Sequence, residues 1–277
     1  QVHTDWWHDL IRPNTYQSHN LSIRGGSQDV TYYVSGNFSR QGGQLEGNDT
    51  KRFTLTNSLD WQSRLGFVSL GLSGGYAKTN SPNSSDYSPE QLVYDLNPYE
   101  SKNSPRLFSH PGRAYSDLTG QFRRWTKEAR LGANLSANLR PWEGLQLDAV
   151  LGLDYVLSES EQVTPATAYS EVTRRRPIER GVISVGKNTD FNYSANLRAT
   201  YQRLFADKHD FSLSANSDYY YNQGRLLSVT GHGIGLQEYL AGVNKGLTAA
   251  DLRPDFTGSN ATSAQRGGGA ALGYTYD

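Results

Sequence analysis

The chain has 277 residues, of which 36% are hydrophobic and 12% aromatic, with Tyr outnumbering Phe by 18 to 9. Its 27 basic and 27 acidic residues cancel, so no global field would attract nucleic acid. Cys and Met are absent, which excludes disulfides, thiol catalysis and thiolate metal sites. No run approaches the ~18 apolar residues of a spanning helix. Because position 1 is not Met, we expect the chain to begin within a longer product or after processing.

Residues 1–17 carry no period-two pattern and predict a lead-in with a short helical or hooked segment. Its Trp6-Trp7-His8 triplet is typical of aromatic anchoring at a membrane interface. A metal site is disfavoured there, because His3 and His8 are spaced too far apart to share one helical face. We therefore expect this segment to enter the sheet without carrying chemistry.

Period-two alternation fills much of the sequence from residue 18 onward. Its clearest stretch is 130–140, in which Leu and Ala at odd positions alternate with polar residues or Gly at even positions. Such alternation gives a strand one apolar and one polar face. We predict nine strands, at 18–25, 30–41, 51–61, 67–78, 130–140, 145–156, 191–203, 211–222 and 267–277.

The connections between these strands alternate strictly in length. Short turns lie near 26–29, 62–66, 141–144 and 206–210, and longer connections near 42–50, 79–129, 157–190 and 223–266. Outer-membrane barrels have this asymmetry, with short periplasmic turns and long extracellular loops. A Tyr-rich soluble sandwich, the alternative, has no reason to sort its loops in this way. The predicted fold class is therefore all-β, an antiparallel transmembrane β-barrel with apolar residues toward lipid and polar residues toward the lumen.

Six short motifs in the chain resemble a known family. They are Thr4-Asp5-Trp6, His19-Asn20-Leu21-Ser22, Gly25-Gly26-Ser27, Tyr32-Tyr33-Val34-Ser35-Gly36, Lys51-Arg52-Phe53 and Leu96-Asn97-Pro98-Tyr99-Glu100. These motifs are similar to the start of the barrel in SusC/RagA-type TonB-dependent transporters of Bacteroidetes, and beyond about residue 140 the similarity is one of strand pattern. The resemblance implies a barrel of about 22 strands with a plugged lumen, of which this chain forms part.

The resemblance also implies parts and partners. A plug, the segment that engages TonB and the later barrel strands would lie outside these residues. Residues 1–17 would lead from plug to barrel, and residues 18–277 would form a partial barrel domain. The implied function is TonB-dependent import of an oligomeric nutrient, glycan or peptide, across the bacterial outer membrane. The implied partners are a SusD-like surface lipoprotein, TonB and outer-membrane lipid, with a dimer of transporter–lipoprotein pairs as the implied assembly.

Candidate substrate contacts follow from position in this interpretation. In the large loop they are Tyr94, Asn97, Tyr99, Arg113, Tyr115 and Trp125, and on the inner wall Arg130, Asp154, Arg198 and Asp218. The segment 88–99 has helical spacing and could cover the lumen, bind a partner or be plain loop structure. Arg174-Arg175-Arg176 could bind an anionic substrate or lipopolysaccharide phosphate, or pair with nearby carboxylates in a solvated loop.

The sequence offers no catalytic constellation. Gly-X-Ser-X-Gly and phosphate-cradling loops are absent. Asp148 and Asp154 occupy alternating strand positions facing a lumen, where carboxylates tune selectivity. We therefore predict no enzymatic activity, no cofactor and no metal site. The alternatives are an outer-membrane scaffold or adhesion barrel without solute transport and, less favoured, an outer-membrane hydrolase.

Overall fold

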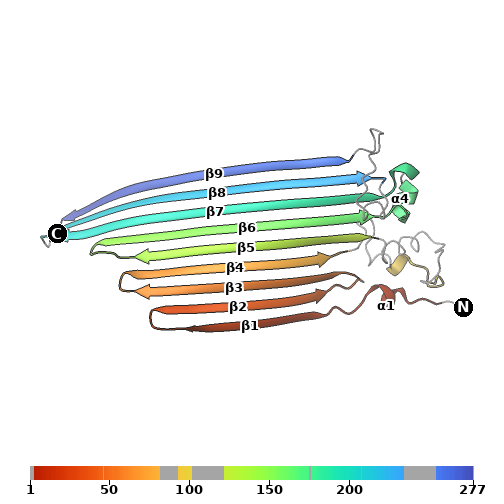
Figure 1. Cartoon of the computed structure of the whole chain (residues 1–277), viewed down its shortest axis with the longest axis horizontal. Coiled ribbons are helices and arrows are strands. Elements are labelled where there is room, and N and C mark those ends of the chain that lie inside the picture. The colour runs from red at the N-terminus through yellow and green to blue at the C-terminus, as the bar shows by residue number, and fades with distance from the viewer. Residues whose placement is uncertain are drawn as a thin grey trace.

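The computed structural model describes residues 3–45, 47–81, 93–101, 122–174, 176–206, 208–233 and 254–276. Across these residues it forms one antiparallel sheet of nine strands, whose order in space is their order in sequence (Figure 1). The predicted all-β fold and its nine antiparallel strands are confirmed. No helix in the described ranges is long and apolar enough to cross a membrane.

The strands lengthen along the chain. They are β1 (Tyr16–Gly26), β2 (Val30–Gly42), β3 (Asp49–Ser63), β4 (Gly66–Asn80), β5 (Arg123–Leu139), β6 (Leu145–Thr164), β7 (Val182–Phe205), β8 (His209–His232) and β9 (Asp255–Tyr276). The predicted long connections after β6 and β8 are therefore too long, because the strands continue into them. In these extensions polar and apolar residues share the same face, as Leu157 and Glu159 do on β6, so alternation fades although the backbone ladder continues.

The register gathers the alternating residues into two distinct faces, because residues opposite each other in a sheet lie on the same side. Leu135 on β5 lies opposite Leu70 and Leu151, whereas Ser136 lies opposite Ser69 and Val150. The apolar face carries Leu55, Leu70, Leu72, Leu131, Leu135, Leu151 and Leu153. The polar face carries Ser35, Asn37, Thr56, Ser58, Ser73, Asn134, Ser136, Asn192, Ser194 and Asn196.

No protein core covers the apolar face of the sheet among the described residues. Leu72 is 46% exposed and Leu131 is 59% exposed, although both sit in the middle of long strands. The buried hydrophobic side chains in the described ranges are instead Trp6, Leu10, Leu96, Phe122, Val163, Ala168 and Ile183, all near the long-loop end. Exposed apolar surface of this extent is unfavourable in water and requires an apolar environment such as lipid.

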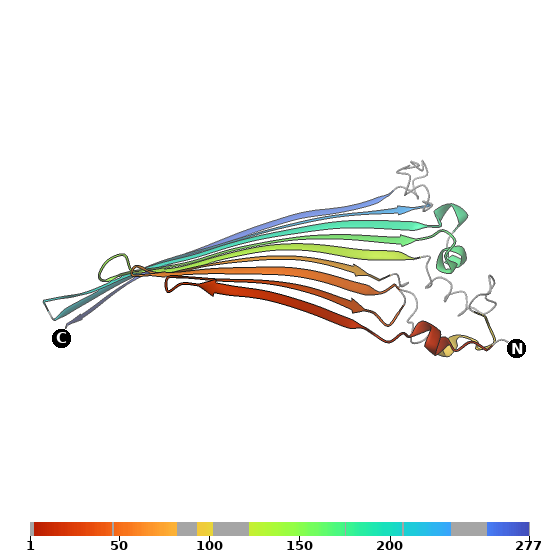
Figure 2. The same ribbon diagram turned by 60° about the horizontal axis from the view of Figure 1, so that its bottom comes forward.

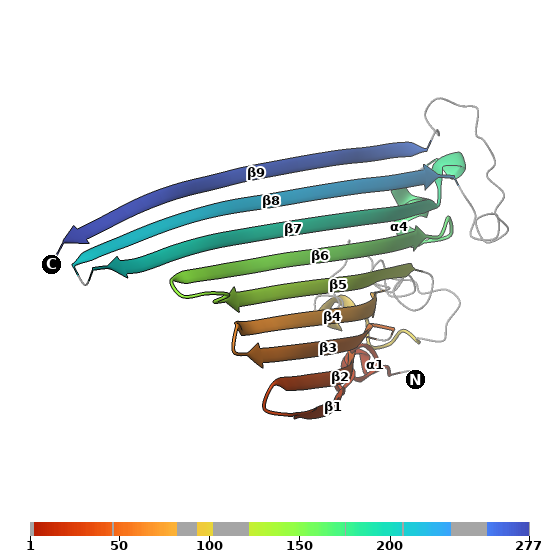
Figure 3. The same ribbon diagram turned by 60° about the vertical axis from the view of Figure 1, so that its left-hand side comes forward.

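The short-turn ends of the strands step outward along the sheet (Figure 3). Val30 is the first residue of β2, at its short-turn end, and the register across the sheet leads from Val30 to Ser217 on β8. Ser217 lies eight residues beyond His209, the first residue of β8 at the same end. This offset, about one residue per strand, brings the turns level when the strands tilt by roughly 40°, the tilt found in outer-membrane barrels.

The helical segments lie only at the long-loop end (Figures 1 and 2). Within the described ranges they are α1 (Trp6–Leu10), residues 93–95, α4 (Tyr169–Arg174) and the 3-10 helix η1 (Pro177–Glu179). The Asp5 carboxylate caps α1 by accepting a hydrogen bond from the His8 N–H at 3.2 Å. Residues 3–15 therefore lie beside the long loops, since β1 runs from that end to the first short turn. That residues 1–17 lead from a plug stays a prediction.

The N-terminal segment packs against the second long connection. The Trp6 indole N–H donates to the Asn97 carbonyl at 2.8 Å, and the Thr4 N–H donates to the Pro98 carbonyl at 2.8 Å. Thr4 Oγ1 also donates to the Glu100 carbonyl at 2.6 Å. Two segments that are ninety residues apart in sequence are thus joined at the rim.

Candidate functional site

The polar face is a continuous surface of hydrogen-bonded side chains. Asp148 accepts from the Asn138 and Gln146 amides. Asn192 accepts from the Asn222 amide at 2.5 Å and from the Tyr220 hydroxyl at 3.3 Å. Because most of these partners are neutral donors and acceptors, the face can exchange hydrogen bonds with water or a polar solute.

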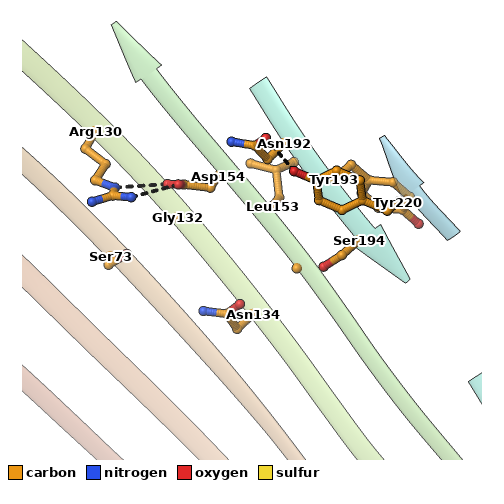
Figure 4. A pocket seen from close by; sticks show the side chains of 11 residues that line it. Ser73, Arg130, Gly132, Asn134, Leu153, Asp154, Asn192, Tyr193, Ser194 and Tyr220 are labelled. Atoms are coloured by element: carbon orange, nitrogen blue, oxygen red, sulfur yellow. Dashed lines mark hydrogen bonds and ion pairs between the residues drawn. The ribbon is translucent and has the colours of Figure 1, made fainter. Parts of the chain in front are cut away.

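An ion pair joins the middle of β5 to β6 on this face. Arg130 Nε and Nη2 donate to the Asp154 carboxylate oxygens at 3.1 and 2.9 Å, a bidentate geometry (Figure 4). The Arg130 side chain is 60% exposed and that of Asp154 34% exposed, so both remain accessible. The pair therefore places one positive and one negative charge on the polar face, and the two charges sum to zero.

A hollow of about 470 Å³ adjoins this ion pair. Its lining residues come from β4 to β8 and are Ser73, Arg130, Gly132, Asn134, Gly152, Leu153, Asp154, Asn192, Tyr193, Ser194 and Tyr220 (Figure 4). A Cβ atom at Gly152 would lie 2.7 Å from Ser194 Oγ, and one at Gly132 would lie 2.5 Å from Ser73 Oγ. At these positions the serine hydroxyls lie directly over the glycine backbone, so another chain or a solute in the hollow can approach the backbone closely.

The four predicted wall residues all lie on the polar face. Arg130 and Asp154 contact each other, as described. Arg198 lies opposite Asp148 and Asn216, further toward the short turns. Asp218 accepts from the Asn216 amide at 3.2 Å. The structure thus places these residues on one surface but at different heights, and their contact with substrate stays a prediction.

The predicted loop residues divide into three groups. Tyr94 and Tyr99 are 81% and 70% exposed, and the Asn97 side chain accepts from the Tyr99 N–H at 3.0 Å. Arg113 and Tyr115 lie outside the described residues. The placement of Trp125 in the large loop is wrong, because β5 begins two residues earlier and pairs with the extended end of β6.

Trp125 lies on the same face as the apolar residues and not on the polar face. Its indole N–H donates to Glu161 Oε1 at 2.9 Å, and Lys127 Nζ stacks over its ring at 4.3 Å from the centroid. Arg123 Nε pairs with the same buried Glu161 carboxylate at 3.1 Å. These contacts give Trp125 a structural role at the strand end, away from the candidate passage.

The other predicted loop features have local structural partners. Arg176 Nε donates to Glu179 Oε1 at 2.8 Å, which matches the interpretation of a loop paired with nearby carboxylates. Arg180 Nη2 donates to the Val172 carbonyl at 3.1 Å, and the Glu171 carboxylate accepts from the Gly181 N–H at 3.1 Å. In the segment 88–99, residues 93–95 are helical and residues 88–92 lie outside the described ranges.

The hollow contains residues that sequence reasoning did not single out. Asn134, Asn192, Ser194 and Tyr220 follow the polar alternation but resemble many other inner-face positions. The signal that distinguishes them is the juxtaposition of glycines on neighbouring strands, which depends on the register. Within the ranges that the structure describes, no group of three or more His, Cys, Asp or Glu residues could hold a metal ion.

Two faces of opposite polarity, a tilted strand register and loops sorted by length define the chain as part of the wall of an outer-membrane-type β-barrel. No family model matches the chain. A structure of the RagAB peptide importer in the closed-closed state matches with a TM-score of 0.72 and 19% identity, covering 99% of this chain and 32% of the matched chain. A structure of the RagAB peptide transporter matches with a TM-score of 0.71 and 19% identity, covering 100% and 32%.

A relative found by sequence similarity agrees with these structural matches. The TonB-dependent receptor P3 of Formosa agariphila is 31% identical over 75 residues, which are 27% of this chain and 8% of the receptor. The chain thus spans about a third of the matched RagAB chains and a smaller share of that receptor. The resemblance predicted from the sequence is confirmed, and the fold is that of a segment of such a transporter barrel.

Proposed function

We propose that this chain forms part of the wall of a TonB-dependent importer in the bacterial outer membrane. The observation that carries the proposal is the two-faced sheet, with an uncovered apolar face and a hydrogen-bonded polar face that includes the Arg130–Asp154 pair. The likeness of the whole sheet to RagAB supports it. In this arrangement the apolar face contacts lipid and the polar face lines the passage beside a plug.

The polar face would assist passage by offering exchangeable hydrogen bonds. Amide and hydroxyl groups such as those of Asn134, Asn192 and Ser194 can replace part of the water shell of a moving solute at little net cost. The Arg130–Asp154 pair adds the remaining guanidinium N–H donors and the remaining carboxylate lone pairs, which the bidentate contact does not use, and it has no net charge. The hollow next to it leaves room for a backbone, of the plug or of the cargo, to lie against the wall.

The cargo in this proposal is an oligomeric nutrient, a peptide or a glycan. RagAB is a peptide importer, which favours a peptide. The neutral donors and acceptors of the polar face suit either chemistry. Above the wall, a SusD-like lipoprotein would cover the long-loop end, where Tyr94 and Tyr99 are exposed. TonB would bind a part of the transporter outside this chain. Each transporter would pair with one lipoprotein, and two such pairs would form a dimer. The proposed function involves no catalysis by this chain.

Uptake by the full-length protein in its native membrane tests the proposal. Cells with and without the gene would be given labelled oligopeptides or oligosaccharides, with and without an uncoupler of the proton-motive force. We expect gene-dependent uptake of one class that the uncoupler abolishes. Equal uptake in both strains would refute the importer, and loss of a bound surface protein without loss of uptake would favour the scaffold alternative.

A pair of glycine variants tests the hollow itself. Gly152→Leu adds a bulky side chain to the lining of the hollow, and the Ser194 hydroxyl must rotate away because the new Cβ would lie 2.7 Å from its Oγ. Gly36→Leu is the matched control on the apolar face of β2, where a Cβ would meet nothing within 4 Å. We expect slower uptake only for Gly152→Leu, with both barrels assembled as judged by heat-modifiable gel mobility. Normal uptake by an assembled Gly152→Leu protein would remove the hollow from the passage.

A further inference from the structure

Four cations form a row across the apolar face near the long-loop end. Arg40 on β2 lies opposite Lys51 on β3, Lys51 opposite Lys78 on β4, and Lys78 opposite Lys127 on β5. Directly opposed residues in a sheet have Cβ atoms about 4.5–5.5 Å apart and lie on the same side. We name these four residues the cation row, which crosses the sheet near the long-loop ends of β2 to β5.

An aromatic row accompanies the cations on the same face. Phe38, Phe53 and Tyr76 are register partners on β2, β3 and β4, two residues nearer the middle of each strand. They are 43%, 49% and 46% exposed, so their rings project from the sheet. Aromatic girdles of this kind mark the level at which a barrel leaves the hydrocarbon and enters the headgroups. The Arg40, Lys51 and Lys78 side chains begin about 7 Å further out, at headgroup depth.

The cation row is poorly neutralised by the protein. Like charges directly opposite each other destabilise a sheet. Lys51 Nζ lies 4.0 Å from the Asp49 carboxylate, which already accepts from the Asn80 amide at 2.6 Å, and Lys127 stacks on Trp125. Arg40 and Lys78 have no ion-pair partner within the described part of the chain. Lys127 also lies opposite Glu159 on β6, whose carboxylate is 3.7 Å from Lys187 Nζ. Arg40, Lys51 and Lys78 therefore share one carboxylate, that of Asp49, which indicates that an external anion completes this part of the row.

We propose that the cation row binds the phosphate groups of outer-leaflet lipid, with the acyl chains lying against the aromatic row. The proposal rests on the outer-membrane location in the proposed function. The imported solute does not fit this position, because the row lies on the face opposite the polar passage. A soluble anion would use the charges but not the aromatic rings, whereas a phosphorylated lipid uses both. Clusters of Lys and Arg at a membrane surface attract anionic headgroups in this way.

Binding of lipid A to the purified full-length protein in neutral detergent tests the proposal. The probes are lipid A and the same lipid with its phosphates removed. We expect the wild-type protein to prefer the phosphorylated form and to lose affinity in high salt. The variant Arg40→Gln/Lys51→Gln/Lys78→Gln should bind lipid A about 100-fold more weakly, at roughly fivefold per cation. Equal binding of both lipids, or wild-type affinity in the triple variant, would overturn the proposal.

A matched control removes three cations elsewhere. Arg24 and Arg52 lie on the polar face, Arg52 being next to Lys51 in β3, and Arg64 lies at a short turn. The variant Arg24→Gln/Arg52→Gln/Arg64→Gln should keep wild-type affinity for lipid A, and an equal loss would also overturn the proposal. Should the first triple variant fail to assemble, Lys78→Gln alone should weaken binding roughly fivefold. Lipid binding without any uptake would refute the proposed import and leave this inference standing.

Discussion

The assignment of one face to lipid and the other to water can be tested with two neighbouring residues. Leu135 and Ser136 are consecutive in β5, and their side chains point to opposite faces. Leu135 lies between Leu70 and Leu151, whereas Ser136 lies between Ser69 and Val150. Replacing each in turn by Arg introduces the same charge and volume at the same height. Only the environment of the charge differs between the two variants.

The expected difference in stability is large. Leu135 is midway along the apolar stretch from Leu131 to Leu139, which corresponds to the centre of the bilayer. An Arg at the lipid-facing midplane of a barrel costs about 2–4 kcal/mol, which lowers the folding equilibrium constant by roughly 30- to 1000-fold. On the wet face the guanidinium keeps its water, and we expect Ser136→Arg to cost no more than about 1 kcal/mol.

The assay is folding of the full-length protein into phospholipid vesicles. The folded fraction is measured by heat-modifiable gel mobility over a urea series, for the wild type, Leu135→Arg and Ser136→Arg. Leu131→Arg adds a depth control, and its cost should be smaller because Leu131 lies nearer the interface. Equal costs for the two central variants, or a greater cost for Ser136→Arg, would refute the assignment of the faces.

Three further changes have defined outcomes. Asp154→Asn breaks the pair with Arg130, and because these side chains are 34% and 60% exposed we expect a stability loss below about 1 kcal/mol in the same urea series, together with slower uptake. Unchanged uptake would separate the pair from transport. Gly144→Ala should lower the folding stability by about 1–3 kcal/mol, because Gly144 has φ +85° and a Cβ there would lie 2.5 Å from the Gln202 carbonyl oxygen. Ala206→Gly, which relieves a φ of +50°, should not lower the folding stability. Trp6→Phe removes the indole N–H that donates to the Asn97 carbonyl, a loss of about 1 kcal/mol. Proteolysis between residues 3 and 15 should therefore be roughly fivefold faster, and an unchanged cleavage rate would count against the contact.

The sequence predicts the fold where lipid and water act on opposite sides of a strand. Leu131 to Leu139 alternate with polar residues because every second side chain meets hydrocarbon, and this part of β5 was predicted. The start of β7 was missed, since Val185, Lys187 and Thr189 share one face with both apolar and polar character. Above the bilayer both faces meet water, so the periodic signal disappears while the backbone pairing persists.

The candidate site was only partly predictable for a related reason. Arg130 and Asp154 each stand out as charges on the inner face, but their contact depends on the register of β5 against β6. The hollow depends on glycines of different strands lying near one another, which no single strand reveals. Trp125 was assigned to a loop because its surroundings do not alternate, although its partner Glu161 lies on the adjacent strand.

The order of the strands also bears on how this sheet can form. Every pairing among the described strands joins strands that are consecutive in the chain, so the cost of loop closure depends on the length of each connection. The connection from β3 to β4 spans residues 64–65, whereas residues 81–122 separate β4 from β5. Closing the longer connection costs about 2–3 kcal/mol more in chain entropy. We therefore expect the strands of the β1–β4 segment and those of the β5–β9 segment to pair independently. The pairing of β4 with β5 should then be the slow step of assembly.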